Sequence, residues 1–467
     1  MSFNYCLILL IAPILIGCNN YNLKTERPNV LFITVDDMND WSTLFNTNNP
    51  IRTPNLIKLA RKGVFFSNAY SSSPACNPSR ASVMTGTRPH KTGVYGNSSN
   101  WRRALKGVKT IQRHLKENGY LVFGSGKIFH HHSNWAFHDN ASFDEYLMMS
   151  INEPRPDKKI NGLEGYGSRS TDWGPWPNNI EKTVDYKTVE YALNKLNKKY
   201  DKPFFLNIGI YKPHSPFFVP QKYFDKYPMD NLVMPLIPKN DTEDLPEGAK
   251  KMTLNKKWFW NGMLKAKEKD PNAYLEYVQA YQACSSFADD MIGKIIDALE
   301  KSQHRENTII ILWSDHGFHL GEKNHFEKFA LWEKSNHIPF IIYAPNVTKS
   351  GTIIDNPVDM TSIYPTLSEL CGLKIPEHTD GYSLVPLLKD SSVKTKPALM
   401  TYMKGNHAVR SKRWRYIEYF DGSKELYDHF NDPNEWNNVA SKEENKEIIS
   451  NLKSFIPKVN KDQVPDL

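Results

Sequence analysis

The chain has 467 residues, of which 40% are hydrophobic and 24% charged, a composition that is typical of folded globular proteins and excludes a largely disordered chain. A length of this order predicts one large domain and a smaller one. The formal net charge is only +8, from 59 basic and 51 acidic residues, and no RNA-binding signature, zinc-finger spacing or long basic run is present. We therefore expect no nucleic-acid partner.

Residues 1–18 form a predicted export segment. The run from Leu7 to Ile16 is almost wholly apolar but too short for a confident transmembrane helix, as in a signal peptide. It ends in Gly17-Cys18, which resembles a bacterial lipobox. We expect a signal peptide with lipobox, membrane attachment through lipidated Cys18, and an exported lipoprotein on the periplasmic side or at the cell surface. No Lys or Arg precedes the apolar run, which departs from the usual pattern. A plain secretory signal is the alternative to the lipoprotein.

Buried strands and long helices alternate along the rest of the chain. Residues 29–35 are almost continuously apolar, as in a strand covered on both faces of a parallel sheet. A short helix is predicted from Thr53-Pro54 to Gly63, and a long one from Ala273 to Lys301, where apolar residues recur every three or four positions. The alternation predicts an α/β fold with a mainly parallel sheet sandwiched by helices. Further predicted strands occupy residues 203–209, 308–313 and 338–343.

Two stretches, 151–180 and 211–250, are rich in turn-forming residues and are predicted to be irregular loops that wall a cleft. After about residue 385 the chain has short strand-like pieces, such as 414–420 and 425–428, which predict a small antiparallel sheet. We therefore expect a large domain over 26–385 and a C-terminal subdomain over 386–467.

Carboxylates follow two of the predicted strands. Asp36 and Asp37 come directly after the first, and Asp315 and His316 follow the strand at 308–313. In open α/β sheets, ligands bind at the carboxyl ends of the strands. Three converging carboxylates repel one another and need a cation, and oxygen ligands favour Ca²⁺ or Mg²⁺. Taken alone, an Asp-Asp pair after a strand is also typical of a helix cap or turn.

The chain contains five cysteines, and one lies in a distinctive motif. Cys76 begins the stretch Cys-Asn-Pro-Ser-Arg, which ends at Arg80 and is followed by Thr85-Gly86. A thiol nucleophile requires a nearby base, and that requirement does not explain the Pro-Ser-Arg sequence. Cys6 and Cys18 belong to the export segment. Only Cys284 and Cys371 could form a disulfide, but an apolar helix around the first favours buried free thiols.

From about Arg27 onwards, the chain resembles the formylglycine-dependent sulfatases of the alkaline-phosphatase-like superfamily, and within them looks closest to the iduronate-2-sulfatase branch. The resemblance implies the alkaline-phosphatase-like fold and conversion of Cys76 to formylglycine by a formylglycine-generating or anaerobic sulfatase-maturating enzyme. The motifs that carry it are Val35-Asp36-Asp37, the cysteine signature, Gly126-Lys127-Ile128-Phe129-His130, Lys212-Pro213-His214, Ser314-Asp315-His316-Gly317, Lys328 and Glu425-Leu426-Tyr427-Asp428.

The resemblance also implies a calcium site. Its ligands would be Asp36, Asp37, Asp315, His316 and an oxygen of the hydrated aldehyde at residue 76. Ca²⁺ would raise the acidity of one hydroxyl of the hydrate, which attacks sulfur as the sugar alcohol leaves. The second hydroxyl would then lose its proton, and the covalently bound sulfate would be expelled as the aldehyde re-forms. Many sulfatases carry Asn where this chain has His316, but the iduronate-2-sulfatase branch shares the histidine.

Cations and histidines complete the implied site. Arg80 would hold the formylglycine hydroxyl, and Lys127 and Lys328 would contact sulfate oxygens. His130 would deprotonate the second hydroxyl and His214 would protonate the leaving alcohol, tasks that suit a group whose pKa lies near working pH. His131 and His132 extend His130 to a triplet, but adjacent residues on a strand point to opposite faces, so we expect no second metal site there.

The expected function is that of a carbohydrate sulfatase acting on a sulfated, acidic oligosaccharide or polysaccharide. Trp101, Arg102 and Arg103 are predicted to lie in a loop that rims the cleft, with His319 nearby, although an ordinary surface explains them almost as well. Two alternatives remain. One is a phosphodiesterase or phosphonate hydrolase of the same superfamily, and the other is a catalytically silent lipoprotein that binds sulfated glycans.

Overall fold

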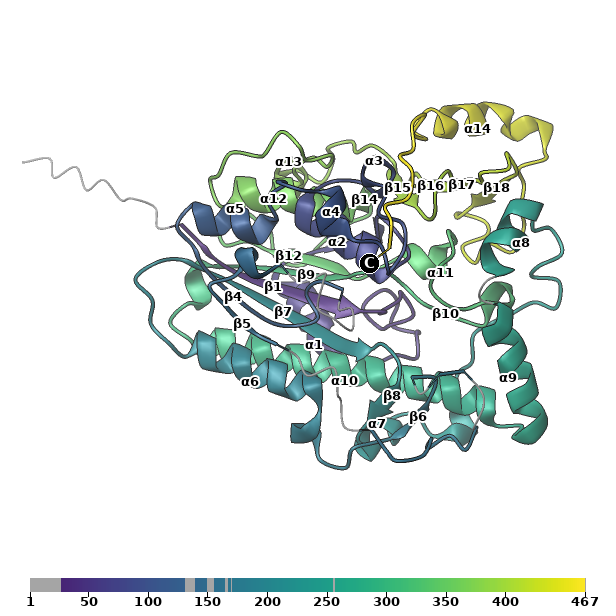
Figure 1. The fold of residues 1–467 in the computed structure, drawn as a ribbon, viewed down its shortest axis with the longest axis horizontal. Coiled ribbons are helices and arrows are strands. Elements are labelled where there is room, and N and C mark those ends of the chain that lie inside the picture. Colours follow the sequence, from purple (N-terminus) through teal and green to yellow (C-terminus); the bar gives the residue numbers. More distant parts are fainter. Residues whose placement is uncertain are drawn as a thin grey trace, which may run out of the picture.

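A computed structural model describes residues 27–130, 139–148, 155–163, 167–168, 170–254 and 257–466. Its centre is an eight-stranded sheet in the order β13-β2-β12-β9-β1-β7-β4-β5 (Figure 1). In this sheet β12 alone runs antiparallel to its neighbours, so the predicted mainly parallel sheet is confirmed. The strands are β1 (Asn29–Asp36), β2 (Val64–Phe66), β4 (Leu121–Gly126), β5 (Glu145–Leu147), β7 (Phe204–Pro213), β9 (Thr308–Ser314), β12 (Phe340–Tyr343) and β13 (Thr352–Ile354).

Helices cover both faces of this sheet, as predicted. Figure 1 shows one layer below it and another above it. The lower layer contains α1 (Pro54–Lys62), α6 (Val184–Leu196) and α10 (Ala273–Lys301), and the upper layer contains α2 (Cys76–Thr85), α5 (Ile111–Glu117) and α12 (Ile363–Leu370). The predicted bounds of the long helix are those of α10.

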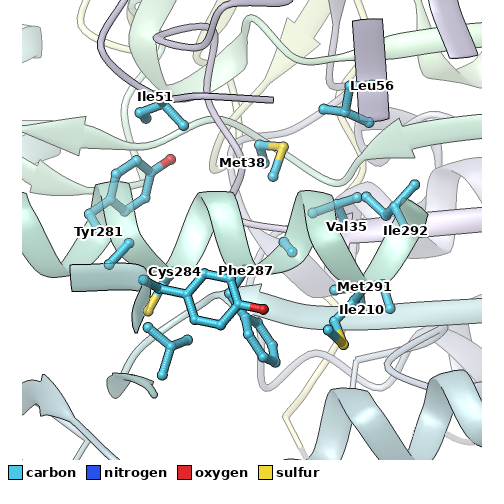
Figure 2. Close-up of a cluster of buried hydrophobic side chains, with 14 of the residues drawn as sticks. Val35, Met38, Ile51, Leu56, Ile210, Tyr281, Cys284, Phe287, Met291 and Ile292 are labelled. Carbon is cyan, nitrogen blue, oxygen red and sulfur yellow. The ribbon is translucent and has the colours of Figure 1, made fainter. Parts of the chain in front are cut away.

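Strand β1 alternates between two hydrophobic cores, which explains its unbroken apolar sequence. Leu31, Ile33 and Val35 belong to the core beneath the sheet, whereas Val30 and Phe32 belong to the core above it. Figure 2 shows the lower core, where α10 packs near the end of β1. Cys284 lies there among apolar side chains, and both it and Cys371 are buried free thiols, as expected.

A separate four-stranded antiparallel sheet follows at the C-terminal side, which confirms the second part of the predicted fold. Its strands pair in chain order and α14 (Lys446–Lys453) packs against it. The subdomain boundary at residue 385/386 stays a prediction. The strands are β15 (Ala398–Thr401), β16 (His407–Arg410), β17 (Trp414–Glu418) and β18 (Lys424–Asp428).

The two stretches predicted to be irregular contain regular elements, so that prediction was partly wrong. β6 (Trp173–Pro175) pairs in parallel with β8 (Phe217–Val219), and α7 (Gln221–Phe224) follows. Pro175 ends β6 and Pro220 directly precedes α7, positions where proline is tolerated. These elements have only three or four residues, too few to show a periodic pattern in the sequence. The remaining elements are β3 (Ala69–Tyr70), β10 (His319–Leu320), β11 (Phe326–Glu327), β14 (Val358–Asp359), α3 (Pro89–Thr92), α4 (Trp101–Ala104), α8 (Glu247–Leu254), α9 (Lys257–Lys269), α11 (Glu333–Asn336), α13 (Val385–Lys389) and several short 3₁₀ turns.

Several predictions concern segments outside the described residues. The export segment with Cys6 and Cys18 is one of them, and His131 and His132 are another. Among the described residues, none of the helices combines the length and apolar character that crossing a bilayer requires.

Candidate active site

The predicted metal ligands meet at the carboxyl ends of β1 and β9. These strands are parallel neighbours whose register pairs Val35 with Ser314, so the residues that follow them emerge at the same level. Asp37 has a φ of 64°, a left-handed conformation that is uncommon outside glycine. All four predicted protein ligands are buried: Asp36, Asp37, Asp315 and His316.

Side chains from the core support this unusual turn. The hydroxyl of Tyr281, on α10, donates to the Asp37 carbonyl at 2.8 Å and accepts from the Asn39 amide at 3.0 Å. The Met38 amide donates to Ser314 Oγ at 3.0 Å. Sequence reasoning treated Tyr281 only as part of an apolar helix face. Nothing in the periodic pattern distinguishes a tyrosine whose hydroxyl supports the site.

The spacing of the ligand atoms fits a single cation. One atom each from Asp36, Cys76, Asp315 and His316 lies within 4.8 Å of the others. His316 Nε2 lies 3.3 Å from Asp37 Oδ1, 3.5 Å from Asp315 Oδ2 and 3.3 Å from Cys76 Sγ. Two ligands at right angles around Ca²⁺, each about 2.4 Å from the ion, would lie about 3.4 Å apart. The donor set therefore fits a calcium ion.

The protonation of this cluster also favours a bound cation. Burial raises the pKa of Asp315 to about 7, an effect that Arg80 opposes and the Asp36 carboxylate reinforces. Burial opposes ionisation of Asp36 as well, but the nearby Lys127 ammonium holds the pKa of Asp36 well below its usual range. Positive charge from the side chains therefore does not fully stabilise the ionised form of Asp315, and a divalent ion would supply the remainder.

The ring of His316 is oriented as a ligand would be. Its Nδ1 lies 3.0 Å from the Gly317 carbonyl oxygen. Because a carbonyl can only accept, Nδ1 carries a proton and donates. Nε2 then faces Asp37, Asp315 and Cys76. A backbone partner of this kind commonly fixes the tautomer of a metal-binding histidine.

Cys76 is the first residue of α2 and is fully buried beside this cluster. Lys328 Nζ lies 3.0 Å from its Sγ, and Lys127 Nζ lies 3.7 Å away. Burial opposes ionisation of the thiol, but the two lysines hold the pKa of Cys76 well below its usual range. Lys127 and Lys328 therefore place fixed positive charge beside residue 76. This charge would stabilise a nucleophile at that position and a bound oxyanion.

Arg80 lies one turn along α2 from Cys76. Its Nε donates to Asp315 Oδ2 at 2.8 Å and its Nη2 to Asp36 Oδ1 at 3.2 Å. Nη1 donates to the Ile128 carbonyl at 3.1 Å. The guanidinium thus bridges two carboxylates of the cluster. Its predicted contact with the hydroxyl of a modified residue 76 stays a prediction.

Both predicted acid–base histidines face Cys76. Burial lowers the pKa of His130, while a hydrogen bond to Cys76 opposes that shift. His214 Nδ1 donates to the Ser215 carbonyl at 2.7 Å, which leaves Nε2 directed at the site, 4.0 Å from Asp37 Oδ2. Lys127, Lys328 and both histidines therefore converge on one sulfur atom, and their individual catalytic roles stay predictions.

Asp185, on α6, holds the backbone just before His214. Its carboxylate accepts from the Tyr211 amide at 2.6 Å and from the Lys212 amide at 2.9 Å. The side chain is buried, and the bonds cross from a helix to the end of β7. Sequence reasoning missed it, because an aspartate in the first turn of a helix is common and signals no particular contact.

Two of the residues predicted to lie at the rim of the cleft, Trp101 and His319, are buried, so the prediction was wrong for them; for Arg102 and Arg103 it stays a prediction. Trp101 begins the short helix α4, is only 1% exposed and stacks on Phe129. Arg102 lies over the Trp101 ring and pairs with Asp139. His319 is buried, with its Nδ1 2.7 Å from Ser335 Oγ. The indole of Trp101 packs in the hydrophobic core. A helix of four residues is too short for its sequence to show which side chains are buried.

Comparison with known proteins shows the family to which the chain belongs. Residues 28–373 match the sulfatase family model, and residues 321–462 match the C-terminal model of N-sulphoglucosamine sulphohydrolase. The chain belongs to the sulfatase family. A sulfatase of Formosa agariphila is 39% identical to it, over 97% of this chain and 92% of that protein. Human iduronate 2-sulfatase is 29% identical over 76% of this chain and 71% of that protein.

The fold of this sulfatase also resembles solved structures. One is a protein in complex with its substrate D-glucosamine-2-N,6-O-disulfate, with a TM-score of 0.73 and 23% identity, covering 92% of this chain and 96% of that one. At this identity the likeness shows the fold alone. The predicted sulfuric ester hydrolase class and the distant relationship to iduronate 2-sulfatase are confirmed by the family match and the similar sequences.

Proposed function

We propose that this sulfatase hydrolyses sulfate esters on a sulfated, acidic oligosaccharide or polysaccharide, using a formylglycine formed from Cys76 and a calcium ion. The observation that carries the proposal is the placement of Cys76 Sγ, 3.0 Å from Lys328 Nζ, 3.7 Å from Lys127 Nζ and within 4.8 Å of ligand atoms of the carboxylate cluster. A maturation enzyme is the implied partner, since the motif that begins at Cys76 resembles its recognition sequence.

The chain's own residues supply charge and protons to this chemistry. When bound, the ion would act as a Lewis acid. The hydrate of the aldehyde would provide two hydroxyl groups on one carbon. Lys127 and Lys328 would hold the sulfate oxygens and stabilise the charge that moves to the leaving oxygen. His130, which contacts residue 76, would accept a proton there. His214 would donate a proton to the leaving alcohol from Nε2, because its Nδ1 is bonded to Ser215.

A saccharide substrate is supported by two similar proteins. One similar structure contains a disulfated glucosamine as its substrate, and a similar human sequence is named for iduronate. Export by the expected signal peptide, with lipid attachment at Cys18, would bring the enzyme to polymers outside the cytoplasm, and this localisation is part of the proposal. The test is a sulfate-release screen of the matured full-length protein across algal and animal sulfated oligosaccharides, with an aryl sulfate and a phosphonate monoester alongside.

We expect sulfate release from at least one sulfated oligosaccharide and little turnover of the phosphonate monoester. Turnover of the phosphonate alone would instead identify a phosphonate hydrolase. Binding of sulfated oligosaccharide by fully matured protein without any sulfate release would identify a catalytically silent glycan-binding protein. Either result would overturn the proposed reaction.

Replacing His214 by alanine should slow hydrolysis in a way that depends on the leaving group. A sugar alcohol is a poor leaving group and needs a proton, so we expect its release to fall by about 10²–10⁴-fold. Nitrophenolate leaves readily, so turnover of nitrophenyl sulfate should fall much less. Steady-state kinetics on both substrates measures the difference. His304→Ala, at the opposite edge of the sheet next to β9, is the matched control and should change neither rate. Equal losses on both substrates would contradict proton donation by His214.

A further inference from the structure

We propose that the C-terminal sheet positions Lys328, with Glu425 and Trp332 as positioning residues, and this inference rests on the proposed contact of Lys328 with sulfate. Lys328 lies in the segment between β11 and α11. Its neighbours Glu327 and Phe329 have φ values of 67° and 77°. Two non-glycine residues in the left-handed region cost free energy, so the surrounding structure must hold this backbone in place.

Contacts within the large domain hold Lys328 itself. His325 Nε2 lies 2.7 Å from the Lys328 carbonyl oxygen, and because that oxygen only accepts, the imidazole donates. The Phe329 amide donates to the Pro74 carbonyl at 3.0 Å. Pro74 lies two residues before Cys76, so the lysine segment is bonded directly to the segment that leads to the nucleophile position.

The C-terminal region contacts residues 331–333, with at least one hydrogen bond to each. Arg415 Nη1, on β17, donates to the Leu331 carbonyl at 2.9 Å. The indole Nε1 of Trp332 donates to Glu425 Oε2, on β18, at 3.0 Å. The Glu333 amide donates to Glu435 Oε2 at 2.8 Å. In Figure 1 the sheet β15–β18 lies above α11, the short helix that begins at Glu333.

Glu425 belongs to the Glu-Leu-Tyr-Asp motif, to which the proposed reaction assigns no role. Its side chain is fully buried, and it accepts hydrogen bonds from Tyr419 and Tyr427 as well as from Trp332. The Trp332 ring packs beside the ring of His325, with centroids 6.2 Å apart. A continuous set of contacts therefore joins Glu425 through Trp332 and His325 to the backbone of Lys328.

The same sheet also reaches the cysteine side of the site. The Thr401 amide, at the end of β15, donates to the Ser72 carbonyl at 3.0 Å. Ser72 lies four residues before Cys76. The C-terminal sheet therefore holds both segments whose side chains meet at the sulfur, and it can fix the distance between Lys328 Nζ and residue 76. A misplacement of about 1 Å is enough to slow catalysis strongly.

The test compares Trp332→Phe with Tyr419→Phe in the matured full-length protein. Each variant removes one hydrogen bond to Glu425, but only the first acts on the Lys328 segment. For Trp332→Phe we expect faster hydrogen exchange in the peptide that spans residues 326–333, and a rise of about tenfold in KM for the sulfated oligosaccharide found by the screen. Binding of inorganic sulfate, measured by calorimetry, should weaken to a similar extent. For Tyr419→Phe the exchange rate of this peptide, the KM and the affinity for inorganic sulfate should stay near those of the protein without substitutions.

A purely structural role of Trp332 predicts something different. Loss of folded protein lowers the apparent kcat but leaves KM and the affinity of the remaining molecules unchanged. Equal effects in the two variants, or unchanged exchange at residues 326–333 in Trp332→Phe, would overturn the proposal. If the unmodified enzyme released no sulfate at all, the proposed function would fail, and the exchange and inorganic-sulfate measurements would still decide whether this contact holds the Lys328 segment.

Discussion

Replacing Cys76 by alanine should lower sulfate release by about 10⁴-fold or more, as for other enzymes that lose their nucleophile. The side chain is fully buried between two lysines and the carboxylate cluster, so the substitution removes the atom beside which these charged groups meet. Sulfate release is measured on the oligosaccharide found by the screen. Mass spectrometry of the peptide that holds residue 76 should show the cysteine-to-aldehyde mass change in active protein that carries no substitution.

Cys284→Ala is the matched control for this experiment. It also removes a fully buried free thiol, but from the apolar core around α10. We expect its activity to stay near that of the unmodified sequence, with a modest loss of thermal stability from the small cavity. Equal turnover in Cys76→Ala, or only unmodified thiol in active protein, would refute the formylglycine mechanism.

Asp315→Asn should lower calcium affinity by at least about a hundredfold, since even the loss of an outer-shell partner costs about 10–100-fold. The substitution removes one of three buried carboxylates while conserving the size of the side chain. Isothermal calorimetry on chelator-treated protein measures the affinity directly. Thermal unfolding provides a second readout, because ligand at about a hundredfold excess over Kd stabilises a protein by about 2.7 kcal/mol. We expect this stabilisation in the unmodified sequence and little of it in the variant.

Asp289→Asn provides the control for a buried aspartate outside the site. Asp289 lies on α10 and accepts from the Asn55 and Leu56 amides, at the start of α1, at 3.0 and 2.8 Å. Its replacement should lower the unfolding temperature but leave calcium affinity unchanged. Calcium binding of normal strength in Asp315→Asn would contradict the assignment of this residue as a ligand.

Much of the fold could be predicted because its main signals are local. The strand predicted at residues 308–313 is β9, because a continuous apolar run is typical of a strand that is buried on both faces. The helix predicted from Ala273 to Lys301 is α10, because apolar residues recur there at helical spacing over many turns. The direction of β12 could not be predicted, because a short apolar run has no sign that distinguishes parallel from antiparallel pairing. The burial of Trp101 was missed for a related reason, as one turn of helix shows no period.

The sequence by itself determined which chemical groups this sulfatase has. Asp36, Cys76 and Asp315 lie in short motifs at the ends of elements, where their identity and local position can be read directly. Only the tertiary structure decided how these groups are held. Tyr281 supports Asp37, Asp185 supports the backbone before His214, and Glu425 contacts Trp332 near Lys328. These contacts join residues that are distant in the chain. They form only when whole helices and strands pack together, and no local sequence pattern specifies that packing.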